Sequence, residues 1–140
     1  MAATQKLKQI LLVEDRDDVK KALVRFLEAR LQISVICASR AQEGYDVVKA
    51  SVEAGEIVRW GVLTDNDMAN EENDWIFSGL DLAEELRELL KSTEGDACII
   101  LITGREIPNP VSRWVDHAFE KPLNMAEICG ILQQFFDSEN

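Results

Sequence analysis

Two pairs of carboxylates each follow directly on a short apolar run of the sequence. Glu14 and Asp15 follow the first such run, and Asp65 and Asp67 follow another near the middle of the chain. Short apolar runs of this kind are typical of strands buried in a parallel sheet. In open α/β sheets, ligand chemistry takes place just beyond the carboxyl ends of the strands. Taken alone, however, Asp65-Asn66-Asp67 is equally compatible with an acidic turn, because Asp and Asn are common turn residues.

Two further polar groups stand at the ends of later apolar runs, namely Thr103 and Lys121. The carboxyl ends of parallel strands share one edge of a sheet, so we expect these groups to converge with the acids. Carboxylates about 5 Å apart repel by roughly 3 kcal/mol at an effective dielectric near 20, so the cluster requires a cation. Hard oxygen ligands in a site open to a phosphate favour Mg²⁺. A nucleophile, a metal and a neutralising ammonium are the requirements of phosphoryl transfer.

Strand patterns alternate with helical patterns along the chain, and this alternation positions the polar groups. It predicts a parallel sheet with helices on both faces, joined by right-handed crossovers. The expected strands are 8–13, 33–37, 59–64, 97–102 and 117–120. Apolar stripes at helical spacing predict helices over 19–31, 45–52, 82–90 and 125–136. We expect one domain over 1–140, with its core at about 8–136 and a surface loop at about 69–78.

Capping and breaking residues predict where the helices begin and end. Asp17 or Asp18 is expected to cap the first helix, and Gly55 to end the second. Capping-box pairs are expected at the starts of the second and last helices, formed by Ser39 with Gln42 and by Asn124 with Glu127. Pro108 and Pro110 exclude a long helix directly after the fourth strand, which leaves one short turn of helix between Val111 and Val115.

The composition excludes several classes of function. The chain has 140 residues and a formal net charge of −11, which argues against nucleic-acid binding and fits a divalent cation or a basic partner surface. No apolar run approaches the ~20 residues of a membrane span, and the first residues do not form a signal-peptide core. Cys37, Cys98 and Cys129 stand far apart in apolar contexts, which predicts reduced core residues and a cytoplasmic protein.

The strand-end motifs together resemble a known family, the receiver domains of two-component response regulators. The motifs are Leu11-Leu12-Val13-Glu14-Asp15, Leu63-Thr64-Asp65-Asn66-Asp67-Met68, Ile102-Thr103-Gly104 and Lys121-Pro122. They occur in the family's order and extend over nearly the whole chain, from about Lys8 to Phe136. The resemblance implies a CheY-like, flavodoxin-like fold with strand order 2-1-3-4-5, here with a reduced fourth helix. It also implies that the chain accepts a phosphoryl group from a histidine kinase or a histidine phosphotransfer protein.

The resemblance implies a role for each acidic residue. Asp65 would be the phosphoacceptor, and Asp15 would ligate Mg²⁺ directly while Glu14 assists, through water. The backbone carbonyl of Asp67 would be the third protein ligand. The family also uses the position two residues after the conserved Thr, here Arg105, to tune the lifetime of the phosphoryl group.

The resemblance assigns the two remaining polar groups to the phosphoryl group itself. Thr103 and Lys121 would contact it, and the bond between Lys121 and Pro122 would be cis, as is usual in the family. The domain would then phosphorylate and dephosphorylate itself with Mg²⁺ without being an enzyme that acts on other molecules.

The sequence departs from the family pattern at three places. Ala69 replaces a proline and begins the apparent insertion 69–78, and the segment between Thr103 and Lys121 is short. The position of the family's aromatic switch residue is Ala118, and Phe119 should face the other way by strand alternation. These departures put the family's relay to an output surface in doubt.

Two other functions fit parts of the pattern. A receiver-like interaction module that never uses phosphate is suggested by Ala118. A phosphatase of the haloacid dehalogenase type is suggested by Asp65-Asn66-Asp67, although that family carries its motif near the start of the chain and needs a later acidic pair. The output partner is not identified by the sequence, and a homodimer stays open. The aromatic sequence Trp75-Ile76-Phe77 could form a partner-binding knob or a lid over the acidic pocket.

Overall fold

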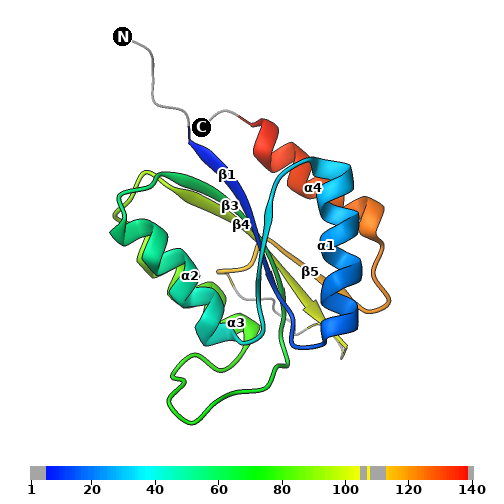
Figure 1. Ribbon diagram of the computed structural model, residues 1–140, viewed down its shortest axis with the longest axis horizontal. Coiled ribbons are helices and arrows are strands. Elements are labelled where there is room, and N and C mark those ends of the chain that lie inside the picture. Colours follow the sequence, from blue (N-terminus) through cyan, green and yellow to red (C-terminus); the bar gives the residue numbers. More distant parts are fainter. Residues whose placement is uncertain (1–5, 105–106, 108–112, 139–140) are drawn as a thin grey trace.

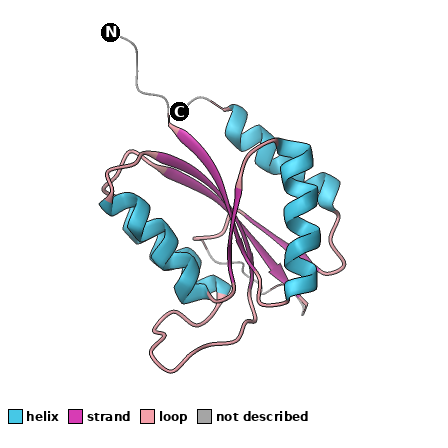
Figure 2. Ribbon diagram, viewed as in Figure 1, coloured by secondary structure: helices cyan, strands magenta, loops and turns pink. Residues whose placement is uncertain are grey.

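Five parallel strands form the centre of the molecule (Figures 1 and 2). The computed structural model describes residues 6–104, 107 and 113–138. The strands are β1 (Leu7–Val13), β2 (Val35–Ala38), β3 (Val58–Asp65), β4 (Asp96–Thr103) and β5 (His117–Glu120). Their order in the sheet is β2-β1-β3-β4-β5, and every neighbouring pair is parallel. This order confirms the expected flavodoxin-like topology, and each strand lies within two residues of its predicted limits.

Helices cover both faces of this sheet. They are α1 (Asp17–Leu31), α2 (Ala41–Glu53), α3 (Gly79–Leu90) and α4 (Met125–Asp137). Figure 1 shows α1 and α4 on one face and α2 and α3 on the other. Because side chains alternate along a strand, each face has its own apolar cluster. Leu11 and Val62 belong to the cluster under α2 and α3, whereas Leu12 and Leu63 belong to the cluster under α1 and α4. None of the described helices has the length and apolarity needed to cross a membrane.

The helix ends confirm some of the capping predictions and correct others. Asn124 caps α4, because its side chain accepts a hydrogen bond from the Glu127 N–H at 3.1 Å. Gly55 follows the end of α2 with a φ of 77°, which suits glycine. The prediction that Asp17 or Asp18 caps α1 is wrong. Arg16 occupies the cap position without a side-chain cap, and both acids lie in the first turn, where they face the positive end of the helix dipole.

The predicted capping box of α2 is also wrong. Arg40 occupies the cap position, and the Ser39 hydroxyl instead accepts a hydrogen bond from Lys20 at 2.6 Å. The Gln42 side chain accepts hydrogen bonds from the N–H groups of Trp75 and Ile76. Tertiary contacts therefore engage both side chains that the local pattern assigned to the cap.

The described residues between β4 and β5 contain no helix, in agreement with the predicted reduction of the fourth helix. The proposed short turn between Val111 and Val115 lies mostly outside the described residues. Arg87 of α3 holds the segment that leads into β5. Its guanidinium donates to the carbonyls of Ala97 and Trp114 and to the Asp116 carboxylate. The α3 helix is thereby joined directly to the start of β4 and to the segment that leads into β5.

Ala118, at the expected switch position, and the next residue, Phe119, face opposite sides of the sheet. Ala118 packs against the cluster under α2 and α3, and Phe119 packs against the cluster under α1 and α4. The prediction from strand alternation is confirmed. The side of the sheet that would carry an aromatic switch residue in the family therefore carries a methyl group in this chain.

Candidate functional site

The register of β1 and β3 brings the two acidic motifs together. Val13 of β1 pairs with Thr64 of β3, so that Glu14 and Asp15 emerge beside Asp65 at the same edge of the sheet. Each of Glu14, Asp15 and Asp65 offers an oxygen atom, and these three atoms all lie within 4.8 Å of one another. The convergence expected from the sequence is therefore present for the three carboxylates.

The buried carboxylate of this group has an unused ligand atom. Glu14 is 3% exposed, and its Oε2 accepts a hydrogen bond from the Asp15 N–H at 3.2 Å. Its Oε1 is buried and has no hydrogen-bond partner among the described residues. A buried oxygen without a partner is costly unless a cation or water satisfies it. Three hard oxygen donors at this spacing fit a magnesium ion.

Glu14 also has the most clearly perturbed acidity in the pocket. Burial raises the pKa of Glu14 from 4.5 to about 7, and the neighbouring Asp65 carboxylate adds to this rise. The Lys121 ammonium opposes the rise in pKa. A carboxyl group whose charge is disfavoured by its surroundings is one that a bound cation would stabilise in the ionised form.

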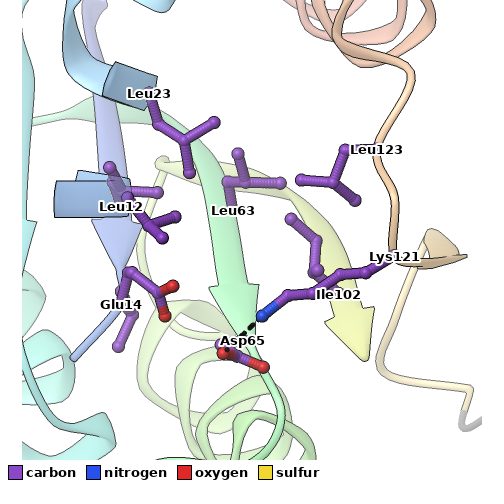
Figure 3. Close-up of a pocket in the computed structure, with 10 residues that line it drawn as sticks. Leu12, Glu14, Leu23, Leu63, Asp65, Ile102, Lys121 and Leu123 are labelled. Carbon is purple, nitrogen blue, oxygen red and sulfur yellow. Dashed lines mark hydrogen bonds and ion pairs between the residues drawn. The ribbon is translucent and has the colours of Figure 1, made fainter. Parts of the chain in front are cut away.

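Lys121 reaches the central acid from the far side of the sheet edge. Its Nζ lies 3.2 Å from Asp65 Oδ2, and Figure 3 shows the side chain extending across the pocket to this carboxylate. The bond between Lys121 and Pro122 is cis, as expected. The Lys121 N–H donates to the carbonyl of Thr103 at 2.9 Å, and Thr103 is buried at the end of β4. The strand-end positions of Thr103 and Lys121 are therefore fixed relative to each other.

The loop after Asp65 reaches the acidic cluster through its backbone. The Ala69 N–H donates to Asp15 Oδ2 at 3.2 Å. Asp67 is exposed, and its carboxylate is not part of the acidic group found among the described residues. The assignment of the Asp67 carbonyl as a metal ligand stays a prediction. Arg105 lies outside the described residues.

The sequence patterns did not identify two residues that hold the Asp65 loop in place. The Asn66 N–H donates to the Ile102 carbonyl, while the Asn66 carbonyl and side chain accept from Gly79 and Leu80. A Cβ atom at Gly79 would lie 2.5 Å from the Asp65 carbonyl oxygen, so only glycine fits there. A glycine near the start of a predicted helix does not by itself predict this contact. The residue that it contacts, Asp65, lies far earlier in the chain.

The chain resembles solved receiver domains in its three-dimensional structure. The receiver domain of the hybrid histidine kinase CckA superposes with a TM-score of 0.67 at 22% identity, over 92% of this chain and 99% of that one. The response regulator TrrA of Thermotoga maritima, solved with Mg²⁺ and beryllofluoride, gives 0.68 at 23% identity with the same shares covered. The receiver domain of Ssk1 from Saccharomyces cerevisiae, solved with the histidine phosphotransfer protein Ypd1, gives 0.67 at 17% identity, over 95% and 91%.

Comparisons of sequence do not add to this likeness. No protein-family model matches the chain. No curated protein matches it either. The strand order, the helices on both faces and the superposition over more than nine-tenths of the chain nevertheless agree. This protein has the flavodoxin-like fold of the response-regulator receiver domains.

Proposed function

We propose that this protein is a magnesium-dependent receiver domain that accepts a phosphoryl group on Asp65. The observation that carries the proposal is the meeting of Glu14, Asp15 and Asp65 at one sheet edge, with the Lys121 ammonium 3.2 Å from Asp65. The Asp65 side chain is 11% exposed, which suits a nucleophile that is reached from one side.

Each residue of the pocket has a separate role in the proposed phosphoryl transfer. An Asp65 oxygen attacks the phosphorus atom, and an O–P bond forms while the N–P bond of a donor phosphohistidine breaks. The electron pair of that bond stays with the imidazole of the donor. Lys121 neutralises charge on the phosphoryl oxygens, and Thr103 donates a hydrogen bond to one of them. Hydrolysis of the acyl phosphate returns Asp65 to its first state.

The same acids hold the metal in this proposal. Asp15 and Asp65 would ligate Mg²⁺ through carboxylate oxygens, with Glu14 acting through water and Asp67 through its backbone carbonyl. The ion, when bound, supplies positive charge beside the acceptor. Asp15 Oδ2 also accepts a hydrogen bond from the Ala69 N–H, so the loop after Asp65 contacts one of the proposed ligands.

The partner proposed for the phosphoryl donor is a histidine kinase or a histidine phosphotransfer protein. Support comes from the fold, since the similar domain of Ssk1 was solved with a protein of the second kind. We also propose a cytoplasmic location. It is consistent with the three cysteines, Cys37, Cys98 and Cys129, which are all free.

One observation favours a second candidate, an interaction module that does not use phosphate. The position expected to carry an aromatic switch residue is Ala118, which packs on the α2 and α3 side of the sheet. In that case the acidic pocket would bind a cation without a phosphoryl step.

Acetyl phosphate with Mg²⁺ separates these two functions. We expect mass spectrometry of the intact protein to show one added phosphoryl group, and Asp65→Asn to show none. The matched control is Asp81→Asn, because Asp81 is exposed on α3 and lies outside the acidic group. An unmodified wild-type protein, or equal labelling of Asp65→Asn, would contradict the phosphoacceptor role.

A further inference from the structure

The insertion 69–78 presents two aromatic side chains to solvent. Trp75 is 54% exposed and Phe77 is 51% exposed, whereas Ile76 between them is completely buried. The two exposed rings are therefore separated by a single residue that is anchored in the core. Exposed pairs of large aromatic residues are enriched at protein interfaces.

The backbone of the insertion is held by Gln42 of α2 and by Arg40, the cap residue of that helix. Gln42 Oε1 accepts from the N–H groups of Trp75 and Ile76, at 3.0 and 3.2 Å. Arg40 forms an ion pair with the buried Asp74 at 3.1 Å, and the same Asp74 oxygen accepts from the Glu71 N–H at 2.9 Å. A loop fixed in this way loses little conformational entropy when a partner binds.

The position of Trp75 distinguishes the two readings of this aromatic sequence. Its ring meets Tyr45 of α2 edge-on, with centroids 5.2 Å apart. Neither Trp75 nor Phe77 lines the pocket around Asp65 and Lys121. The segment is therefore a surface knob and not a lid over the acidic pocket.

The surroundings of the knob are strongly acidic. The stretch 65–81 contains no Lys, Arg or His, and its acids are Asp65, Asp67, Glu71, Glu72, Asp74 and Asp81. Arg40 reaches two of them, Glu71 and Asp74, at 3.4 and 3.1 Å. Glu72 remains exposed beside the aromatic pair, and Asp46 of α2 is exposed one residue after Tyr45. A partner must therefore combine an apolar surface with positive charge around it.

We propose that Trp75 and Phe77, with their acidic rim, form a docking site for a basic amphipathic helix of a partner protein. Such a helix offers an apolar stripe for the two rings and Lys or Arg side chains for the rim. The docking site is separate from the phosphoacceptor chemistry and does not require Asp65 to carry a phosphoryl group.

A labelled model peptide tests this proposal directly. The probe is an amphipathic helix built from Leu and Lys, and the comparison peptide carries Glu in place of Lys. We expect fluorescence anisotropy to show binding of the Leu/Lys peptide alone, with an affinity that falls as salt rises. The double variant Trp75→Ala, Phe77→Ala should weaken binding by about tenfold or more.

Two variants serve as controls. Phe26→Ala removes an exposed aromatic ring from α1, at the opposite face of the sheet, and should leave the affinity unchanged. Glu127→Gln removes an exposed acid from α4, also on the opposite face, and should bind as the wild type does. Binding is measured without a phosphoryl donor, so failure of the phosphoacceptor proposal would not affect this result. Circular dichroism of the double variant checks that the fold is kept, which is expected because buried Ile76 and Asp74 are unchanged.

Three results would overturn the docking site. The first is equal affinity of the double variant and the wild type. The second is an equal loss in Phe26→Ala, which would indicate adsorption to any apolar surface. The third is self-association of the wild type in sedimentation that the double variant abolishes, because the knob would then bind a second copy of this chain.

Discussion

At the scale of single residues, Gly79 is tightly constrained by the loop that carries Asp65. A Cβ atom there would lie 2.5 Å from the carbonyl oxygen of Asp65 and 2.8 Å from Cδ1 of Leu101. The first of these neighbours is backbone, which cannot rotate away as a side chain can. The missing side chain therefore lets α3 begin directly against the loop that carries Asp65.

Replacing this glycine should destabilise the protein. We expect Gly79→Ala to lower the free energy of unfolding by roughly 1–3 kcal/mol, because overpacking forces the Asp65 loop to shift. Gly130→Ala is the matched control, since Gly130 lies within α4 and a Cβ there meets nothing within 4 Å. The control should gain up to about 1 kcal/mol from better helix propensity. Urea unfolding measures both, and equal effects at the two sites would contradict the close contact.

The residues of the site differ in how far the sequence could predict them. Asp65 and Lys121 were predictable because each follows a strand, and parallel strands deliver their ends to one edge. Asn66 and Gly79 were not, because their contact forms only when the chain returns after the insertion. The spacing of residues within a motif carries no information about such a return.

At the scale of elements, one amide oxygen of α2 holds two backbone N–H groups of the insertion. Gln42 is 8% exposed, and its Oε1 accepts two backbone N–H groups of the knob. The sequence pattern instead paired Gln42 with Ser39 in a capping box. Both arrangements satisfy backbone donors, and the buried position of Gln42 beneath the insertion decides between them.

Removing the Gln42 amide should weaken the attachment of the knob to α2. In Gln42→Ala, the N–H groups of Trp75 and Ile76 lose their partner, at a cost of about 1–3 kcal/mol for a buried unsatisfied group. We expect faster hydrogen exchange at these two amides, measured by NMR. Gln133→Ala on α4 is the control, because Gln133 is exposed and its side-chain amide donates to Asp137 of the same helix. Unchanged exchange in Gln42→Ala would show that other contacts hold the knob.

The elements themselves were largely predictable, because hydrophobic periodicity and strand–helix alternation are local properties. The helix caps were less so. The cap of α4 by Asn124 was confirmed, whereas the predicted caps of α1 and α2 were wrong. Ser39 and Gln42 both bond to distant elements, and local patterns cannot anticipate such competition.

For the whole molecule, the acidic pocket couples folding to pH. The folded pKa of Glu14 is about 7, above its unfolded value of 4.5, mainly because of burial. The folded state then binds a proton that the unfolded state releases. The resulting stabilisation is complete below pH 4.5 and is lost as the pH rises through about 7.

This linkage can be isolated by comparison with a neutral isostere. Without Mg²⁺, we expect the wild type to lose thermal stability between pH 5 and pH 8 relative to Glu14→Gln. Saturating Mg²⁺ should reduce the difference, because a bound cation favours the ionised carboxylate. Calorimetry across this range measures both effects. Parallel curves for the two proteins without metal would show that Glu14 titrates normally in the folded state.

The topology of the whole molecule came from the family resemblance and not from periodicity. Alternation predicts a parallel sheet with helices on two faces, but several strand orders satisfy it. The resemblance to receiver domains implied the order 2-1-3-4-5, which the structure confirms. The form of the insertion could not be predicted, since its sequence matches no regular periodicity.

Asn66 closes the insertion at its base. Its own carbonyl and side-chain oxygen accept the N–H groups of Gly79 and Leu80, and its N–H is bound to β4. These hydrogen bonds of Asn66 join the two ends of the segment 67–78, and we call them the clasp. The entropy of closing such a loop grows only with the logarithm of its length. The clasp therefore allows the exposed stretch 70–73 to differ in length and sequence between related proteins, or to be changed by design, while Ala69 keeps its hydrogen bond to Asp15 and Ile76 stays in the core.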